Sequence, residues 1–334
     1  MTEHYYGKQA YNSHAIPDQR YEAPSFGRSL AKLQLPWGNT QEVFYPNMMP
    51  QHLRAEEKGQ QDDQKKGRKN PFSGENFHFR YDHEVYRFAK AALLTRIIAF
   101  MRVFGFVTTC GYGVAIFIAY LFFLVIMDGT FIEKNIMFLP GLWFIGVPAG
   151  TWLFFYAIMR FLPPSWWLRP SKGSRWELNR KTGLVTIYHR RQQPFIAPFY
   201  EFDPYVNMTA DRSGFTSYTL HLAHRYSSQS FNAMGFVPMG YAEQTCFAQW
   251  DFLQNFMDTS RPLPDAPEWE VSRPLDPVTA AYDQQTGRNP RYWIDMDETT
   301  WKQVSQAMRD KILIIDTMTR IDLMEPHLIK GLKT

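Results

Sequence analysis

The 334-residue sequence has a formal net charge of +4 and a mean hydropathy of −0.36, so most of the chain is polar. The small basic excess does not require a nucleic-acid partner, because much of it lies beside apolar segments, where one Lys or Arg gains about 1 kcal/mol near anionic lipid. The two cysteines, Cys110 and Cys246, lie in an apolar segment and in a polar one. We therefore expect no disulfide and a reducing compartment.

Residues 1–75 show neither the alternation of a strand nor the 3.6-residue period of a helix. Tyr, Pro, Gly and Gln are scattered through them, and the charged stretch 56–69 lies near their end. This composition predicts a disordered or loosely docked N-terminal arm. The aromatic and proline-containing pieces 21–26 and 35–37 could dock on a partner or on the chain's own domain.

An amphipathic segment, residues 83–102, follows. Helix-forming residues predominate in it, and an apolar stripe passes through five positions: Val85, Phe88, Ala92, Leu93 and Ile97. This pattern predicts an interfacial helix that leads into the next segment.

Residues 103–127 and 136–159 form two apolar runs of 25 and 24 residues without Asp, Glu, Lys or Arg, separated by residues 128–135. Each exceeds the roughly 20 residues that an α-helix needs to cross about 30 Å of hydrocarbon. We therefore predict a transmembrane helical hairpin over residues 103–159. Glycines in both runs favour close contact between the helices and permit a homo-oligomer.

Basic residues flank the hairpin on both sides and are rare between its helices, which predicts that both termini are cytoplasmic. We call the following residues the basic rim: Arg96, Arg102, Arg160, Arg169 and Lys172. Residues 1–10 lack the apolar core of a cleavable signal peptide. The lipid bilayer is thus the first predicted partner of a multi-pass protein.

The pattern changes to short alternating runs after residue 164, which predicts a small antiparallel sheet or partial barrel. The expected strands are residues 175–179, 184–189, 195–202, 205–210, 215–223 and 229–234. Residues 179–183 join the first two as a hairpin turn, in which Gly183 can supply a positive φ. Apolar positions spaced by three and four over residues 242–257 predict an amphipathic helix that caps the sheet.

Two spanning helices, about six strands and a closing helix resemble the membrane-anchored pleckstrin-homology-like (PH-like) domains of bacteria. The resemblance covers residues 100–258 and is carried by this order and by the hairpin LNRKTGLVTIY. It implies an α+β membrane protein, a two-helix transmembrane hairpin followed by a PH-like β domain at residues 170–258. Members of this superfold bind peptides, lipids or proteins, and the fold does not say which.

Residues 259–334 begin with a Pro-rich stretch, 261–277, which predicts an extended linker. A last helix is expected over residues 300–324, although residues 312–315 equally suit a strand. Three segments resemble a family of uncharacterised proteobacterial inner-membrane proteins found beside type VI secretion components: residues 250–265, 273–279 and 283–293. This resemblance implies the bacterial inner membrane and a toxin, an effector or a secretion component as the protein partner.

No set of residues predicts catalysis, a cofactor or a metal. His221 and His224 would point to opposite faces of a strand. Cys246 lies on the apolar face of its predicted helix and is expected to be packed in a core. The acidic trio Asp295, Asp297 and Glu298 could act as acids and bases or hold a cation, but a solvated turn before the last helix is favoured. No glycine motif for phosphate is present, and the apolar runs lack the ionisable groups of transporters.

These observations predict a non-enzymatic, inner-membrane-anchored protein-binding factor. The resemblance implies an immunity or effector-accessory role in type VI secretion. The expected partner surface consists of Arg180, Lys181, Arg190, Arg191, Arg288, Arg291, Tyr292 and Trp293. A lipid-binding or lipid-modifying module that uses the basic rim is the alternative, and a hydrolase using the acidic trio is the third possibility. A basic surface made of the turn at residues 180–183 and Arg190–Arg191 could face lipid or an acidic partner. The alternative is that these residues form a solvated face of the hairpin.

Overall fold

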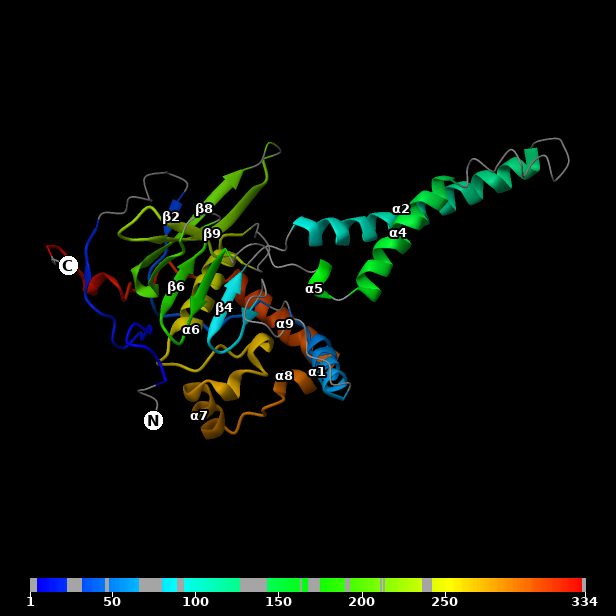
Figure 1. Ribbon diagram of the computed structural model, residues 1–334. Helices are drawn as coiled ribbons and strands as arrows, with labels where there is room; N and C mark the ends of the chain where they lie inside the picture. The colour runs from blue at the N-terminus through cyan, green and yellow to red at the C-terminus, as the bar shows by residue number, and fades with distance from the viewer. Residues whose placement is uncertain are drawn as a thin grey trace. The chain divides into compact units, whose positions relative to one another are not determined.

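The computed structural model describes residues 5–22, 32–45, 48–65, 80–88, 93–126, 143–162, 164–167, 175–189, 193–210, 212, 214–235 and 242–331 (Figure 1). The chain is a mixed α+β protein that divides into two compact units. Unit 1 contains Met1–Ala89 and Gly173–Thr334, and unit 2 contains Lys90–Lys172. Unit 1 is therefore built from two separate parts of the sequence.

A five-stranded antiparallel sheet in unit 1 has the order β3-β4-β5-β6-β7. Its strands are β3 Arg80–Tyr81, β4 Val85–Phe88, β5 Trp176–Asn179, β6 Leu184–Ile187 and β7 Phe195–Pro198. The predicted hairpin is confirmed: Asn179 pairs with Leu184, and Gly183 has a φ of +76°. A side chain on Gly183 would also collide with the backbone of Gln9, so this position needs glycine for two reasons.

A second antiparallel sheet has the order β10-β9-β8-β2. Its strands are β2 Lys32–Gln34, β8 Phe202–Ala210, β9 Thr216–His224 and β10 Ser230–Asn232. A short 3-10 helix, η3 Phe199–Glu201, separates β7 from β8, so residues 195–202 do not form the single strand expected. A two-residue parallel pair joins β1 Gln19–Arg20 to β11 Leu328–Ile329.

Much of the described part of residues 1–75 packs into unit 1, so the predicted disordered or loosely docked arm is wrong there, although most of residues 51–65 are exposed. Residues 35–37 dock on the chain's own domain, which is one of the two predicted alternatives. Tyr11, Leu35, Trp37 and Phe44 are all buried in the core, and β2 pairs with β8. Helix α1, Pro50–Lys65, follows. Their contacts are non-local: Trp37 packs on Tyr11, Phe199 and Trp250, and Phe44 packs on Trp293. Such contacts need no local period, and none is visible in the sequence.

The predicted interfacial helix over residues 83–102 is wrong in its first part. Residues 80–88 form the β3–β4 hairpin, and β4 pairs with β5 on the other side of the apolar segment. Helix begins only at Leu93. The buried side chains of Val85 and Tyr86 pack in this sheet, so non-local pairing overrides the local helical pattern.

Helix α6, Gln244–Met257, lies in the core of unit 1, and residues 245–257 are buried on every face. It is not the amphipathic cap that was predicted. Its polar side chains are covered by the N-terminal segment: Gln254 accepts a hydrogen bond from the Gly38 N–H at 2.7 Å, and Asn255 donates to the Gln41 carbonyl at 2.8 Å. The polar face therefore meets protein instead of water.

The C-terminal part belongs to the same core. It contains η4 Pro267–Trp269, η5 Arg273–Leu275, α7 Pro277–Thr286, α8 Tyr292–Asp295, α9 Glu298–Leu313 and η6 Glu325–His327. The predicted extended linker is thus interrupted by two 3-10 helices, and the last long helix ends 11 residues before residue 324. Trp269 is fully buried and stacks on Phe256 at 5.3 Å between ring centroids.

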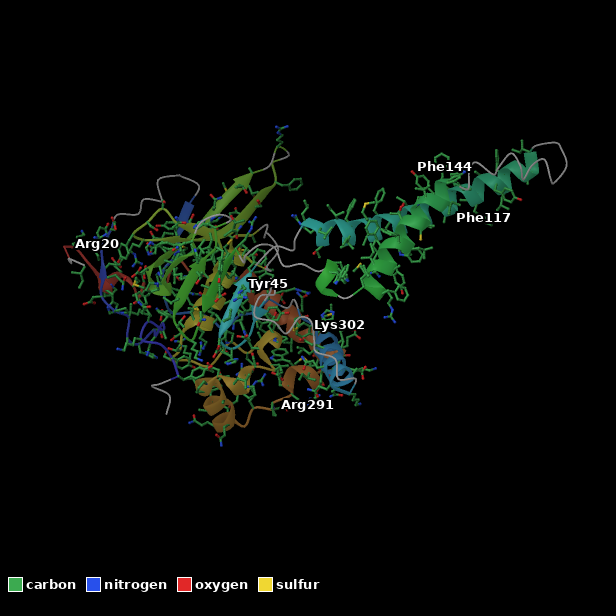
Figure 2. The ribbon with its side chains drawn as sticks, in the orientation of Figure 1. Arg20, Tyr45, Phe117, Phe144, Arg291 and Lys302 are labelled. Atoms are coloured by element: carbon green, nitrogen blue, oxygen red, sulfur yellow. The ribbon has the colours of Figure 1, made fainter. Side chains whose placement is uncertain are left out.

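Unit 2 consists of α2 Leu93–Ile126, α4 Trp143–Phe161 and α5 Pro164–Trp167. Helices α2 and α4 are long and apolar enough to cross a membrane and lie against each other. Figure 2 labels Phe117 and Phe144 on this pair, and each side chain is 62% exposed. The short connection predicted at residues 128–135 lies outside the described residues.

The glycines of the two apolar runs were predicted to lie where the helices touch. Of the described glycines in unit 2, only one does so. A Cβ on Gly105 would approach the Trp152 backbone nitrogen to 2.8 Å, so glycine is required there. In the described helices, a Cβ at the other four glycines would meet no atom within 4 Å: Gly111, Gly113, Gly146 and Gly150. Among these glycines, only Gly105 therefore lies where the two backbones approach closely, while side chains extend the contact, as Phe106 does with Trp152 and Tyr112 with Phe144.

Candidate functional site

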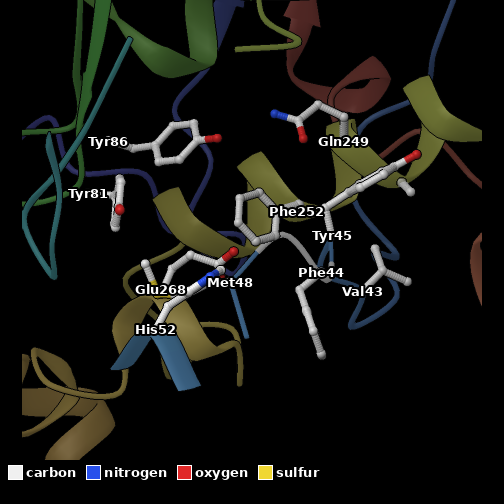
Figure 3. A pocket seen from close by; sticks show the side chains of 11 residues that line it. Val43, Phe44, Tyr45, Met48, His52, Tyr81, Tyr86, Gln249, Phe252 and Glu268 are labelled. Atoms are coloured by element: carbon white, nitrogen blue, oxygen red, sulfur yellow. The ribbon is translucent and has the colours of Figure 1, made fainter. Parts of the chain in front are cut away.

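A cavity of about 150 Å³ lies inside unit 1 between the N-terminal segment, the β3–β4 hairpin, α6 and η4 (Figure 3). Its lining is mostly aromatic and apolar. The lining residues are Val43, Phe44, Tyr45, Met48, His52, Tyr81, Tyr86, Ala248, Gln249, Phe252 and Glu268. We refer to this site as the Glu268 cavity.

Regular local structure positions most of these side chains. Tyr81 and Tyr86 are cross-strand partners in the β3–β4 hairpin, which brings their side chains together. Gln249 and Phe252 are three positions apart on α6 and so share one helix face. Glu268 is the middle residue of η4. The cavity is thus formed by elements on both sides of the apolar insertion in the sequence.

The aromatic rings of the cavity form a connected cluster. The rings of Tyr86 and Phe252 meet edge to face at 6.0 Å, and Phe252 stacks on Trp269 at 5.0 Å. Tyr86 also hydrogen-bonds with Gln249, and burial raises the pKa of its hydroxyl. Gln249 in turn donates to the Ala233 carbonyl at 3.0 Å. These contacts hold the walls in place and keep the Tyr86 phenol neutral.

Glu268 is the one acidic residue among the described residues that line the cavity. Its Oε2 atom is out of contact with water and has no hydrogen-bond partner among the described residues, although other atoms of the residue are partly exposed. Burial raises the pKa of this carboxyl to about 7, and its own backbone N–H opposes that rise. A buried carboxylate without a partner is costly. The carboxyl can therefore pair with a cation or, when protonated, donate a hydrogen bond.

A wider groove of about 330 Å³ lies between α1 and α9. Several of its polar groups have protein partners. Arg54 donates to the carbonyls of Ile294 and Met296 at 2.8 and 3.0 Å, and Lys302 pairs with Glu298 at 3.1 Å. Unlike the Glu268 cavity, this groove has no buried polar atom without a hydrogen-bond partner among its described lining residues.

Arg180 does not lie on the predicted partner surface, because its side chain is completely buried. It forms an ion pair with Asp276 at 3.2 Å and donates to the carbonyls of Asp258 and Arg261 at 2.8 and 2.7 Å. Its neighbour Lys181 is 42% exposed and pairs with Glu84 at 2.8 Å. Arg190 and Arg191 lie outside the described residues.

The second predicted cluster is divided between core and surface. Trp293 is buried and donates from its indole to Asp265 at 2.7 Å, and Arg288 is mostly buried between Asp265 and Glu270. Arg291 is exposed and pairs with Glu57 at 2.7 Å. Together with Lys181, only Arg291 and Tyr292 of the described partner-surface residues are substantially exposed.

Three residues of the basic rim are described. Arg96 and Arg160 are exposed, and Arg102 on α2 lies over the Tyr156 ring of α4 at 5.5 Å. The start of α2 and the end of α4 therefore lie at the same end of the helical pair. Arg169 and Lys172 are outside the described part of the chain.

The other chemically reactive candidates have structural roles. Asp297 caps α9 by accepting from the Thr299 and Thr300 N–H groups, while Asp295 pairs with Arg291 and Glu298 with Lys302. All three carboxylates are exposed and lie near the start of the last helix, as predicted, but only Asp297 lies in the connection, because Asp295 ends α8 and Glu298 begins α9. Cys246 is buried in the core, as predicted, and burial raises the pKa of its thiol to about 12.

The two histidines lie on β9, as predicted. His224 contacts Glu201 through Nε2 at 3.0 Å and Ser227 through Nδ1 at 2.9 Å. Within the described residues, no group of three or more His, Cys, Asp and Glu side chains could hold a metal ion.

Sequence reasoning missed the Glu268 cavity because its walls come from four distant segments. Glu268 lies in the stretch predicted to be an extended linker. Tyr86 lies in the predicted interfacial helix over residues 83–102, and Tyr81 lies just before it. The Tyr-and-Phe-rich composition of residues 43–45 and 81–88 was the available signal. Comparison with protein-family models, with curated proteins and with solved structures finds no match for this chain.

Proposed function

We propose that this chain is a non-enzymatic binding protein anchored in the bacterial inner membrane by α2 and α4, with unit 1 as its binding domain. One observation carries the anchoring: none of the described residues of α4 is buried, although the helix is almost entirely apolar. A water-soluble protein seldom exposes so large an apolar surface. Lipid supplies the environment that this surface requires.

The distribution of charge supports the orientation. Arg96, Arg102 and Arg160 lie at one end of the helical pair, which would be the cytoplasmic end by the positive-inside rule. The chain enters α2 and leaves α4 at this same end of the helical pair. In the proposal, unit 1 therefore works in the cytoplasm.

The Glu268 cavity is the proposed binding site in unit 1, because it combines aromatic walls with one unmatched carboxyl. A PH-like relationship of the two sheets and α6, and an immunity or effector-accessory role in type VI secretion, rest on the sequence resemblances. In that setting the protein partner is a toxin, an effector or a secretion component. The exposed Arg291 and Tyr292 are the first positions at which to test such a contact.

Cysteine labelling in membrane vesicles tests the anchoring. Cys110 lies within α2 and Cys246 in the core, so a charged maleimide should label neither in intact vesicles. An added cysteine at the exposed position Lys302 should be labelled in inverted vesicles and protected in right-side-out ones. Extraction of the full chain by alkaline carbonate, or labelling of Cys110 from water, would contradict the proposal.

Binding of anionic lipid headgroups at the basic rim is the second candidate, since Arg96 and Arg160 are exposed. Such binding depends on charge and should be lost at about 1 M salt, where the Debye length is about 3 Å. Flotation of the detergent-purified protein with anionic and neutral vesicles, at low and high salt, measures it. Equal binding to both vesicle types would contradict this candidate.

A further inference from the structure

We propose that the Glu268 cavity binds an alkylammonium group, with the Glu268 carboxylate as counter-ion and the rings of Tyr81, Tyr86 and Phe252 as its walls. The inference rests on the binding function proposed above and names the chemical class of the ligand. Three observations support it: the Glu268 carboxylate lacks a cationic partner among the described residues, the cavity walls are aromatic, and the cavity is small.

Three other buried carboxylates of unit 1 each pair with an arginine. Asp276 pairs with Arg180, Glu270 with Arg288, and Asp251 with Arg320. Glu268 has no such cationic partner among the described residues, and no Lys or Arg lines the cavity. A ligand cation would take the place that an arginine takes at the other sites.

The walls suit a cation that is apolar at its surface. A cation within about 6 Å of an aromatic centroid is attracted by the negative face of the ring, and proteins use this attraction to recognise quaternary ammonium ligands. Tyr81, Tyr86 and Phe252 surround the space beside the Glu268 carboxyl (Figure 3). Burial raises the pKa values of both tyrosines, so they present neutral rings. Methyl groups on the ligand nitrogen would fill the apolar lining.

The size limits the ligand to a small head group. A cavity of about 150 Å³ is known to hold one benzene-sized molecule, whereas drug-sized ligands need about 300–1,000 Å³. The exposed His52 lies beside Glu268 and Met48 in Figure 3, which gives a longer ligand a way out. The alkylammonium group could thus belong to a free cation or to a lipid headgroup.

The affinity should depend on pH, because only the ionised carboxyl pairs with a cation. With the carboxyl pKa at about 7, affinity should rise about tenfold between pH 6 and pH 8 and change little above that. Other titratable groups also face the carboxyl: Tyr81 on β3, Tyr86 on β4 and His52 on α1, with Glu56 acting through Tyr81.

The experiment is a calorimetric titration of the full-length protein in an uncharged maltoside detergent with tetramethylammonium chloride at pH 6 and pH 8. 3,3-Dimethylbutanol serves as a neutral ligand of similar shape, and sodium chloride keeps the ionic strength constant. We expect saturable binding of the cation, stronger at pH 8, and at least tenfold weaker binding of the alcohol. Absence of saturable cation binding at pH 8, or equal binding of the alcohol, would overturn the proposal.

Two variants separate the role of Glu268 from general effects of charge. Glu268→Gln keeps the shape of the side chain and should weaken cation binding at least tenfold, while the exposed Glu298→Gln should leave it unchanged. A thermal unfolding curve confirms that each variant is folded. Cation binding by folded Glu268→Gln at wild-type affinity would exclude the carboxylate as counter-ion.

A last arm identifies the source of the ligand. Dihexanoyl-phosphatidylcholine, used as a monomeric lipid, should compete with tetramethylammonium if the cavity accepts a lipid headgroup, and choline alone should compete if it accepts a free cation. Cysteine labelling in vesicles reports anchoring independently of this titration. Failure of cation binding would therefore remove the ligand class and leave the membrane anchor standing.

Discussion

Glu268 makes the stability of unit 1 depend on pH in a defined direction. Its pKa of about 7 in the folded chain exceeds the ordinary value of 4.5, so the folded state binds the proton more tightly than the unfolded state. The contribution to stability is therefore fully present below about pH 4.5 and is lost as the pH rises to about 7.

We expect Glu268→Gln to be more stable than the wild type at pH 8 by up to about 3 kcal/mol, since each pKa unit is worth about 1.4 kcal/mol. Most of this advantage should disappear at pH 5. Thermal or urea unfolding of the two proteins at both pH values measures the difference in their free energies of unfolding. The contributions of the other titrating groups are the same in both proteins and cancel in this difference. An advantage that is equal at the two pH values would contradict the assignment.

Arg180 and Lys181 are neighbours in one turn with opposite environments, and they offer a matched pair of substitutions. Arg180→Met leaves buried Asp276 without its cation and should cost about 3–5 kcal/mol. Lys181→Met removes a largely exposed ion pair and should cost at most about 1 kcal/mol. Unfolding in urea compares them.

Adding Asp276→Asn to Arg180→Met should recover part of the loss, because asparagine removes the unpaired charge and can still cap α7. Equal losses from the two single substitutions would mean that the buried position of Arg180 is not maintained in solution.

At the scale of elements, the sequence predicted those helices and turns that depend only on neighbouring residues. The β5–β6 hairpin follows from a five-residue turn that ends in Gly183, and the apolar helices of unit 2 follow from composition alone. The pairing of β4 with β5 and of β2 with β8 could not be predicted in this way, because each joins segments far apart in the chain. The burial of Arg180 depends likewise on Asp276, 96 positions away.

The contact between α2 and α4 provides a test at one glycine. Gly105→Val should weaken the helix pair by about 1–3 kcal/mol, because the new side chain would overlap the backbone at Trp152. Gly111→Val changes helix propensity in the same way but meets nothing within 4 Å of its Cβ among the described residues. The fraction of protein that stays monodisperse on a sizing column after heating in detergent compares them. A larger loss for Gly111→Val would contradict the packing described here.

At the scale of the whole molecule, unit 2 is an insertion between two paired strands of unit 1. The Arg175 N–H donates to the Phe88 carbonyl at 2.9 Å, so the two points at which the chain leaves and re-enters unit 1 lie next to each other. We expect a chain in which a short Gly-Ser link replaces residues 90–172 to fold as a soluble protein. Circular dichroism, sizing and tetramethylammonium titration check this expectation. Recovery of the shortened chain only in inclusion bodies would contradict it.

The covering of α6 by the N-terminal segment also sets an order of events during synthesis. The Pro36 carbonyl accepts from the Trp250 indole, 214 positions later in the chain. At about 5–20 residues per second, the segment around Trp37 leaves the ribosome roughly 10–40 s before the helix that buries it. During this interval the aromatic residues around Trp37 are exposed and could aggregate while the apolar segment of the proposed anchor is inserted into the membrane. The nascent chain should therefore depend on a holding chaperone for longer than its length alone suggests.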